Sequence, residues 1–335
     1  MDARTPTQED DPVTAETTTE TASGTAAAQE APSVFGELSG MEFLKGHGTG
    51  NDFVLVADPE GQLLLGDDVV RLACDRHRGI GGDGFIRIVR SAALPEGREL
   101  LEQDPSAEWF MDYRNGDGSI AEMCGNGVRV FVRALLQQGL VELGEGAMLR
   151  IGTRGGLKTV AATADGFAVD MGPWGFIDGD RARERGSDAV VTAQGLKVPR
   201  PGVSITMGNP HTVVALAEGE KLDHLQLWTE PEVRPVPPEG TNVEFVVPGD
   251  DEGDGIGRLR LRVHERGAGE TQSCGTGACA AAAATRFWAG ASAPDEYLVQ
   301  VPGGIVSATF VAGPGGAEHV VLAGPAEIVA RGVFA

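Results

Sequence analysis

Two cysteines stand in nearly the same short sequence at two distant places in the chain. Cys124-Gly125-Asn126-Gly127 and Cys274-Gly275-Thr276-Gly277 both read Cys-Gly-x-Gly, and each precedes a stretch typical of an apolar helix. The copies lie 150 residues apart (274 minus 124), far enough for each to belong to its own domain. We therefore expect two thiols at the N-termini of two helices.

A helix N-terminus favours bound anions and ionised thiols. Its first backbone N–H groups have no partner within the helix and carry about half a positive charge, and neighbouring glycines let a ligand approach them. A carboxylate is the simplest anion to bind there. The same field is expected to lower the pKa of either cysteine from about 8.5 towards neutrality.

Two sulfur atoms on opposite sides of one carbon would invert a stereocentre. One sulfur would remove the α-proton, the helix ends would stabilise the charge that develops on the carboxylate, and the other sulfur would protonate the opposite face. This chemistry requires no cofactor. Cys74 and Cys279 are interpreted as small buried residues, and Cys279, about 140° around the helix from Cys274, is expected to face away.

The elements that position the two cysteines follow the same order twice. An alternating strand at 109–114 runs into the polar turn 115–119 before Cys124, and another at 258–263 runs into 265–271 before Cys274. Apolar spacing predicts a helix from Val128 to Leu136 that ends at Gly139, and an alanine-rich helix follows at 278–288. Strands do not alternate regularly with helices, so two similar α+β halves are predicted.

The remaining chain is expected to consist mainly of short strands. They are predicted at 41–45, 53–56, 85–89, 149–152, 157–162, 167–171, 203–207 and 243–247, with a helix at 67–76 and a proline-rich loop at 231–238. The stretch 79–84 matches the dinucleotide pattern G-x-G-x-x-G, but a helix precedes it and a strand follows it. That order is the reverse of the nucleotide-binding context, so no such site is predicted.

Composition limits the kinds of partner. The chain has 335 residues, 49 glycines and a net charge of -22, which argues against nucleic-acid and anionic-membrane partners. It lacks an apolar run of about 20 residues and a secretory signal, and its four cysteines and six histidines form no metal motif, so we expect a cytoplasmic protein with reduced thiols and no metal. Residues 1–40 are predicted to be a disordered acidic N-terminal tail.

Other polar residues have ordinary interpretations when each is taken alone. His211 could be a packed or capping histidine, and Glu265-Arg266 could be a surface pair. Asparagines most often occupy turns, which would account separately for Asn51, Asn115, Asn209 and Asn242. A single Cys-Gly-x-Gly would also be weak, but two copies in matching contexts favour a functional site.

Taken together, several motifs resemble the diaminopimelate epimerase family. The resemblance rests on residues 48–53, 115–119, 123–127, 207–211 and 265–277, in order and at suitable spacing, and it covers the chain from about Met41 to the end. It implies an enzyme that interconverts LL- and meso-diaminopimelate without a cofactor, for lysine and peptidoglycan synthesis. It also implies a homodimer of chains with two pseudo-symmetric domains, each a mostly antiparallel barrel-like sheet around a central helix.

The resemblance further implies the roles of individual residues. The domains would span 41–170 plus 322–335 and 171–321, with the site in the cleft between them. Cys124 and Cys274 would be the acid/base pair, and His211 and Glu265 would tune them. Substrate would be bound by Asn51, Asn115, Gly125, Asn126, Asn209, Asn242, Glu265, Arg266, Gly275 and Thr276.

Two positions depart from the family pattern. Gly84 stands where some relatives carry a glutamine that contacts substrate, so that contact is missing or replaced. Ala330 stands where some relatives carry an aromatic residue associated with dimer contact, which weakens the case for that particular dimer.

Three alternative functions remain open from the sequence. A proline racemase-like enzyme would share the two cysteines but would not need groups for a second amino-acid end. A thiol hydrolase would pair one cysteine with a histidine, such as Cys124 with His211, and leave the other thiol idle. A carboxylate-binding protein without activity would use the helix ends alone. If the two sulfurs face each other, oxidation is expected to join them reversibly.

Overall fold

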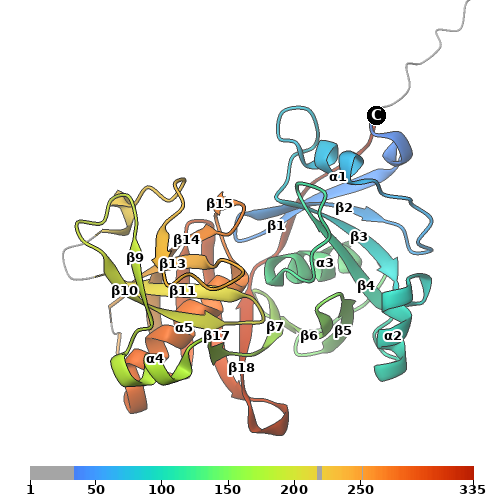
Figure 1. Ribbon diagram of the computed structural model, residues 1–335. Helices are drawn as coiled ribbons and strands as arrows, with labels where there is room; N and C mark the ends of the chain where they lie inside the picture. The colour runs from blue at the N-terminus through green and yellow to red at the C-terminus, as the bar shows by residue number, and fades with distance from the viewer. Residues whose placement is uncertain (1–33, 217–220, 251) are drawn as a thin grey trace, which may run out of the picture. The chain divides into compact units, whose positions relative to one another are not determined.

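The computed structural model describes residues 34–216, 221–250 and 252–335 (Figure 1). Most of the predicted acidic tail, residues 1–33, therefore lies outside the described residues. For residues 34–40 the prediction of disorder was wrong: Gly36–Leu38 forms a short 3₁₀ helix. Phe35 and Leu38 are buried there, and the Phe35 ring packs 5.0 Å from the ring of Phe334, so two apolar side chains secure this segment.

The helices confirm the three that the sequence predicted and add two more. They are α1 (Asp67–Cys74), α2 (Pro95–Gln103), α3 (Gly125–Gln137), α4 (Gly179–Arg185) and α5 (Gly275–Ala289). Sequence patterns did not indicate α2 or α4, because each buries a single small residue, Gly97 or Ala182, and so lacks an apolar stripe.

The end of α3 is the glycine stop that the sequence predicted. Gly139 adopts φ +67°, its N–H bonds to the Leu136 carbonyl at 3.1 Å, and the Leu140 N–H bonds to the Leu135 carbonyl at 2.9 Å. This pair of bonds satisfies carbonyls that the helix leaves free and is the Schellman arrangement.

The strands occupy most of the remaining described chain. They are β1 (Glu42–Gly48), β2 (Asn51–Ala57), β3 (Gly84–Arg90), β4 (Trp109–Asn115), β5 (Met148–Thr153), β6 (Gly156–Thr163), β7 (Gly166–Pro173), β8 (Gly175–Phe176), β9 (Ala189–Thr192), β10 (Arg200–Thr206), β11 (Pro210–Ala215), β12 (Glu232–Arg234), β13 (Asn242–Pro248), β14 (Gly257–Glu265), β15 (Gly269–Glu270), β16 (Glu296–Val301), β17 (Gly304–Ala312), β18 (Glu318–Gly324) and β19 (Glu327–Val333). The predicted strands are confirmed. The predicted loop at 231–238 was wrong for β12, which pairs with β9 before the proline-rich part continues.

Strands of the N-terminal half lie around α3. Their order by pairing is β19, β1, β2, β3, β4, β5, β6 and β7, antiparallel except for β2–β3 and β4–β5. The helix buries Val128, Phe131, Val132 and Leu135 completely against these strands. The apolar stripe of the sequence is thus the face that holds α3 within the sheet (Figure 1).

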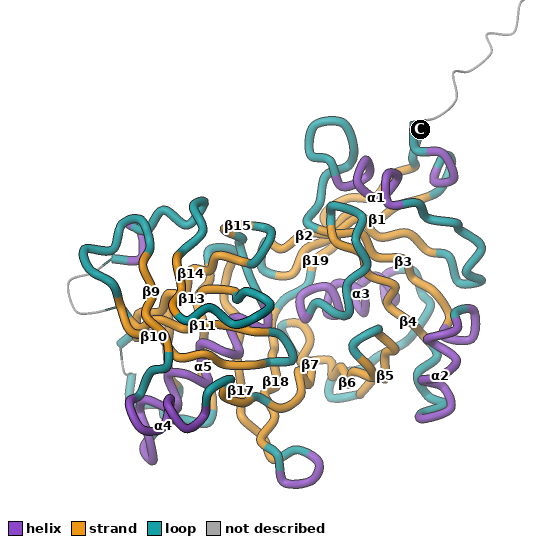
Figure 2. Tube along the Cα trace, viewed as in Figure 1, coloured by secondary structure: helices purple, strands orange, loops and turns teal. Residues whose placement is uncertain are grey.

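The C-terminal half repeats this plan around α5. The pairing order is β18, β17, β16, β14, β13, β11 and β10, antiparallel except for β14–β16 and β11–β13. Figure 2 shows α5 as a helix with these strands beside it. Its alanines from Ala280 to Ala284 are fully buried, because side chains of one carbon let strands approach closely.

One ladder joins the two halves. Strand β18 pairs with β17 on one side and with β7 on the other, where Val169 lies opposite Leu322. After β18 the chain continues into β19, which pairs with β1 in the N-terminal half. The domain boundaries expected at 170/171 and 321/322 stay a prediction that agrees with this pairing.

Candidate active site

Cys124 and Cys274 occupy equivalent positions in the two halves. Cys124 is the N-cap of α3 and Cys274 is the N-cap of α5, both with extended backbone angles. The Gly277 N–H donates to the Cys274 sulfur at 3.4 Å, as a first-turn amide does to a capping side chain. The prediction of two thiols at two helix N-termini is confirmed.

The two helix N-termini meet. The Asn126 side-chain amide of α3 donates to the Ser273 carbonyl at 3.0 Å, immediately before Cys274. A Cβ at Gly275 would lie 3.4 Å from the Asn126 Oδ1 and 3.0 Å from Leu322, and a Cβ at Gly125 would lie 3.3 Å from the same leucine. The glycine after each cysteine therefore permits the close approach of the two helices.

The turn between β1 and β2 brings further groups of the N-terminal half to this junction. Thr49 Oγ1 donates to Ser273 Oγ at 2.7 Å across 224 positions of sequence. Asn51 Oδ1 accepts from Asn126 at 3.2 Å and lies 3.5 Å from the Cys124 sulfur. Its amide group donates to Asp83 Oδ2 at 2.8 Å, which orients the side chain. Asn51 is therefore placed beside Cys124.

His211 anchors the C-terminal side of the site. It is fully buried, with Nδ1 2.7 Å from Glu244 Oε1 and Nε2 3.0 Å from Asn209 Oδ1. Asn209 in turn donates to Thr276 Oγ1 at 3.4 Å, in the first turn of α5. Among the described residues no hydrogen bond joins His211 to Cys124, so the histidine is not placed as a hydrolase would require.

Glu265 and Arg266 follow the end of β14 and flank Cys274. Glu265 is half-buried, accepts a hydrogen bond from Thr271 and faces the Cys274 thiol. The Arg266 backbone N–H donates to Asn242 Oδ1 at 2.9 Å, which connects this segment to the His211 group. The exposed Arg266 guanidinium bonds to the Glu239 carbonyl. Its charge thus lies at the outer edge of the site.

The expected direction of the thiol pKa shifts was wrong. Burial raises the pKa of Cys124 to about 11; backbone N–H groups of Gly127 and Asn126 and the charge of Arg129 only partly oppose this, and Glu265 adds to it. Burial also raises the pKa of Cys274 well above its ordinary value, and Glu265 and Glu244 raise it further. Loss of water outweighs the helix field at both sulfurs.

The two thiols therefore have different surroundings. Glu265 disfavours both thiolates, Glu244 further disfavours that of Cys274, and the Arg129 guanidinium partly favours that of Cys124. Burial raises the pKa of Cys74 and of Cys279 to about 12 each, as expected for buried cysteines outside the site.

Tyr113 fills the space beside Gly84. A Cβ at Gly84 would lie 2.5 Å from Tyr113 Cε2, so a larger residue there would displace the ring. The Tyr113 hydroxyl donates to Asn115 Oδ1 at 3.1 Å, and Asn115 donates to Ser119 Oγ at 3.0 Å. Burial raises the pKa of Tyr113, with the charges of Cys124 and Glu265 contributing, which places the hydroxyl near the site. Tyr113 and the Arg114 carbonyl together occupy the place that a side chain at position 84 would take.

Tyr113→Phe is expected to raise KM about 3- to 10-fold with little change in kcat. The ring would remain, but Asn115 would lose the donor that orients it, at a cost typical of one hydrogen bond. Steady-state kinetics measure both parameters. Tyr297→Phe is the matched control, because the Tyr297 hydroxyl is buried in β16 and has no partner among the described residues. Equal KM values for the two variants would contradict a role for Tyr113.

Some site groups were not indicated by the motifs. No motif assigned a role to these residues, because none of them is a chemically active residue of a repeated pattern: Glu244, Arg129, Tyr113, Ser273 and Asp83. Glu244 and Arg129 did carry a signal: Glu244 is the single charge in the apolar run of a strand, and Arg129 lies with Arg133 in the apolar run of a helix. Charged side chains are seldom buried without a partner, so a charge inside an apolar run indicates a candidate functional residue.

The described chain shows neither a metal-binding cluster nor a membrane-spanning helix. Over residues 34–216, 221–250 and 252–335, no three His, Cys, Asp or Glu side chains cluster as a metal-binding group. Within the same residues, every helix is too short or too polar to cross a membrane.

Solved structures share this fold. A hydroxyproline epimerase from Agrobacterium vitis aligns with a TM-score of 0.58 at 16% identity, over 87% of this chain and 91% of that one. A Bacillus anthracis phenazine biosynthesis protein of the PhzF family also aligns with a TM-score of 0.58 at 16% identity, over 87% and 98%. The fold thus places the chain in the class of α+β proteins that contains these two structures.

Sequence comparison defines the family more closely. The family model described as diaminopimelate epimerase matches residues 43–177 and 203–329. Diaminopimelate epimerase of Streptomyces coelicolor is 48% identical over 88% of this chain and 95% of the relative, and that of Thermobifida fusca is 44% identical over 87% and 97%. The chain belongs to the diaminopimelate epimerase family. It is an isomerase, as the resemblance implied.

Proposed function

We propose that this chain interconverts LL- and meso-diaminopimelate with Cys124 and Cys274 as two opposed bases and with no cofactor. The observation that carries the proposal is the meeting of two cysteine-capped helix N-termini through Asn126 and Ser273. Membership of the family supports the choice of substrate. We assign the reaction to the supply of lysine and peptidoglycan precursors.

The reaction transfers two protons. The substrate α-carboxylate binds the free N–H groups of α3 and α5, which stabilise the negative charge that develops on it. A thiolate on one side takes the α-proton and becomes a thiol. The thiol on the other side gives its proton to the opposite face and becomes a thiolate. The product has inverted configuration, and the two sulfurs have exchanged protonation states.

The raised thiol pKa values are compatible with this proposal. A buried sulfur with a high pKa is a strong base once it is ionised, and it returns its proton only to a carbanion-like centre that is more basic still. Substrate also adds an ammonium group beside the α-carbon, and a nearby cation favours the thiolate. We therefore propose that substrate binding, rather than the helix field alone, produces the reactive thiolate.

The remaining polar groups bind the rest of the substrate. We propose that Asn51, Asn209, Asn242 and Arg266 hold the two amino-acid ends, which a single-ended substrate such as proline would not need. Asn115 and Glu265 complete the set, and His211 positions Asn209 beside Thr276.

Exchange with solvent deuterium tests the proposed reaction. LL-diaminopimelate incubated with the protein in D₂O is expected to give meso product that carries one deuterium at the inverted α-carbon, as measured by mass spectrometry and NMR. Inversion without deuterium would contradict proton transfer through the cysteines. Racemisation of proline at comparable efficiency would instead favour the proline racemase alternative.

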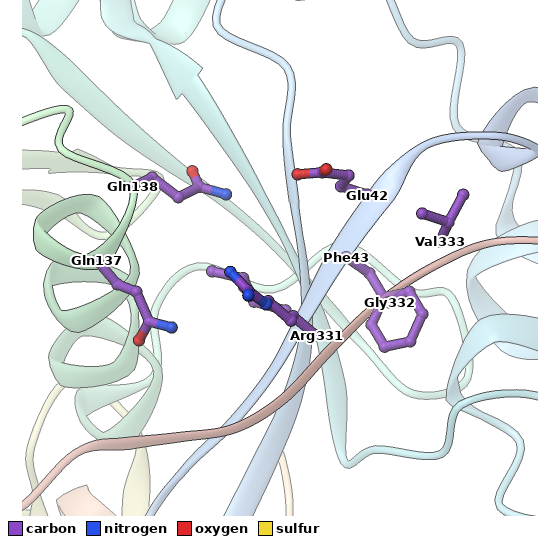
Figure 3. A pocket seen from close by; sticks show the side chains of 8 residues that line it. Glu42, Phe43, Gln137, Gln138, Arg331, Gly332 and Val333 are labelled. Carbon is purple, nitrogen blue, oxygen red and sulfur yellow. The ribbon is translucent and has the colours of Figure 1, made fainter.

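We further propose that the protein acts in the cytoplasm as a homodimer. The support for the dimer is family resemblance together with a groove of about 580 Å³ between β1, β19 and the end of α3, lined by Phe43, Gln138 and Arg331 among others (Figure 3). Val329 and Val333 of β19 are 55% and 59% exposed. Light scattering should give twice the chain mass; the mass of one chain would contradict the dimer.

A further inference from the structure

Arg129 is a buried cation without an acidic partner in the part of the chain that the structure describes. It lies in the second turn of α3, is fully buried, and forms no ion pair with any carboxylate among the described residues. Burial lowers the pKa of Arg129 to about 10, so the side chain is still charged at neutral pH. Most arginines are exposed or paired, which makes this one exceptional.

The position of Arg129 is unfavourable for the fold alone. A buried charge without a partner costs free energy, and a cation near a helix N-terminus is opposed by the positive end of that helix. A neutral residue of similar volume would avoid both costs. The charge is therefore better explained by the site than by stability.

Arg129 orients the residue that joins the two helices. Its Nη2 donates to Asn126 Oδ1 at 2.9 Å, and its Nε donates a longer bond of 3.5 Å to the Pro325 carbonyl. With Oδ1 occupied, the Asn126 amide group points to Ser273 and Asn51. The third nitrogen, Nη1, has no hydrogen-bond partner among the described residues.

The two copies of the motif differ at this position. Arg129 is the fifth residue after Cys124, and the fifth residue after Cys274 is Cys279. The titratable groups that face Arg129 are the thiols of Cys124 and Cys279, while Glu265 faces Cys124 from the other half. The first copy of the motif is thus followed by a guanidinium at the position where the second copy is followed by a thiol.

We propose that Arg129 is a positioning residue of the epimerase site: it holds the Asn126 amide across the junction and supplies the fixed positive charge that balances the Cys124 thiolate. This inference rests on the proposed function. It also accounts for the free Nη1, since an anion at the junction would complete the coordination of the guanidinium.

Alkylation of Cys124 tests the charge without depending on turnover. In full-length protein carrying Cys274→Ala, the rate of iodoacetamide attachment to Cys124 is measured from pH 7 to 9 by peptide mass spectrometry. Because the pKa of Cys124 lies above this range, the rate at a fixed pH is proportional to the thiolate fraction. Adding Arg129→Met or Arg129→Gln should lower this fraction and slow the reaction about tenfold at pH 8. Arg129→Lys keeps the charge and should restore most of the rate.

Arg133→Met is the matched control. Arg133 lies one turn further along α3, donates to the neighbouring Ala326 carbonyl at 3.0 Å and stacks on Phe167, but it does not contact Asn126. Its loss should leave the rate of Cys124 alkylation at pH 8 unchanged. In protein with both cysteines, Arg129→Met should lower kcat at least about tenfold, a loss that Arg129→Lys should partly rescue.

The outcomes separate this inference from the proposed function. An unchanged rate of Cys124 alkylation at pH 8 in Arg129→Met and Arg129→Gln, or an equal slowing in Arg133→Met, would overturn the role of Arg129. If both uncharged variants fail to fold, Arg129→Lys decides, because a tenfold slowing despite its retained charge would also overturn it. Normal epimerisation by Cys124→Ala would refute the proposed function instead, whatever Arg129 does to the thiol.

Discussion

Cys124→Ala and Cys274→Ala should each lower the rate of diaminopimelate epimerisation by about 100- to 10,000-fold. Each change removes one of the two groups that exchange protons with the substrate, while both helix N-termini and the carboxylate site remain. Chiral chromatography of LL and meso isomers measures the loss. Since alanine is smaller than cysteine and leaves the backbone unaltered, each variant should remain folded.

Cys74→Ala is the control for loss of a buried thiol. Cys74 ends α1, is 5% exposed and lies outside the site, so its removal should leave the epimerisation rate nearly unchanged. Full activity in either Cys124→Ala or Cys274→Ala would rule out the two-base mechanism. Loss with Cys124→Ala alone would favour a single nucleophile, as in the hydrolase alternative.

Each single variant should still exchange one isomer with solvent. The remaining thiolate faces only one side of the α-carbon, so it can remove and return a proton there without inversion. One variant is expected to label the LL isomer at the reacting carbon in D₂O and the other to label the meso isomer. Their comparison would assign each cysteine to the face it serves, which the symmetry of the motifs leaves open.

Glu244→Ala should lower the free energy of unfolding by about 3–5 kcal/mol, the range typical of a broken buried pair. The Glu244 side chain is fully buried, and Oε1 lies 2.7 Å from His211 Nδ1. Its removal would leave His211 without this partner. It would also open a cavity beside Gly277, where an added Cβ would lie 2.8 Å from the Glu244 carboxylate. Urea denaturation measures the change.

Glu252→Ala is the matched control for Glu244→Ala. Its carboxylate pairs with Arg258 at 3.0 Å, but its side chain is 63% exposed, so the expected loss is at most about 1 kcal/mol. A loss for Glu244→Ala as small as the loss for Glu252→Ala would refute the structural role of the His211–Glu244 pair. Glu244→Gln keeps the volume and should therefore destabilise less than Glu244→Ala.

Local patterns in the sequence predicted the helix after Cys124 and both of its ends correctly. The Cys-Gly-x-Gly motifs, the stripe from Val128 to Leu135 and the stop at Gly139 specify where α3 begins, which face it buries and where it ends. These features depend on residues within a few positions of one another, so they can be read without knowledge of the remaining chain.

The electrostatics of the site could not be obtained in this way. A helix N-terminus alone favours a thiolate, yet burial raises the pKa of Cys124 to about 11. Burial depends on strands and side chains far away in sequence, and at these sulfurs it outweighs the local field. The same limit applies to residues 34–40, where Phe35 becomes ordered only because Phe334, at the other end of the chain, covers it.

By itself, then, the sequence determined two α+β halves, two cysteine-capped helices and the resemblance to a family, because short-range periodicity and motifs encode them. Only the folded chain shows that Asn126 meets Ser273, that Glu244 pairs with His211 and that no carboxylate of the described residues pairs with the buried Arg129. Each of these contacts requires strand pairing between distant segments, such as β7 with β18. Such pairing is a property of the whole chain, and no single stretch of it specifies the partner.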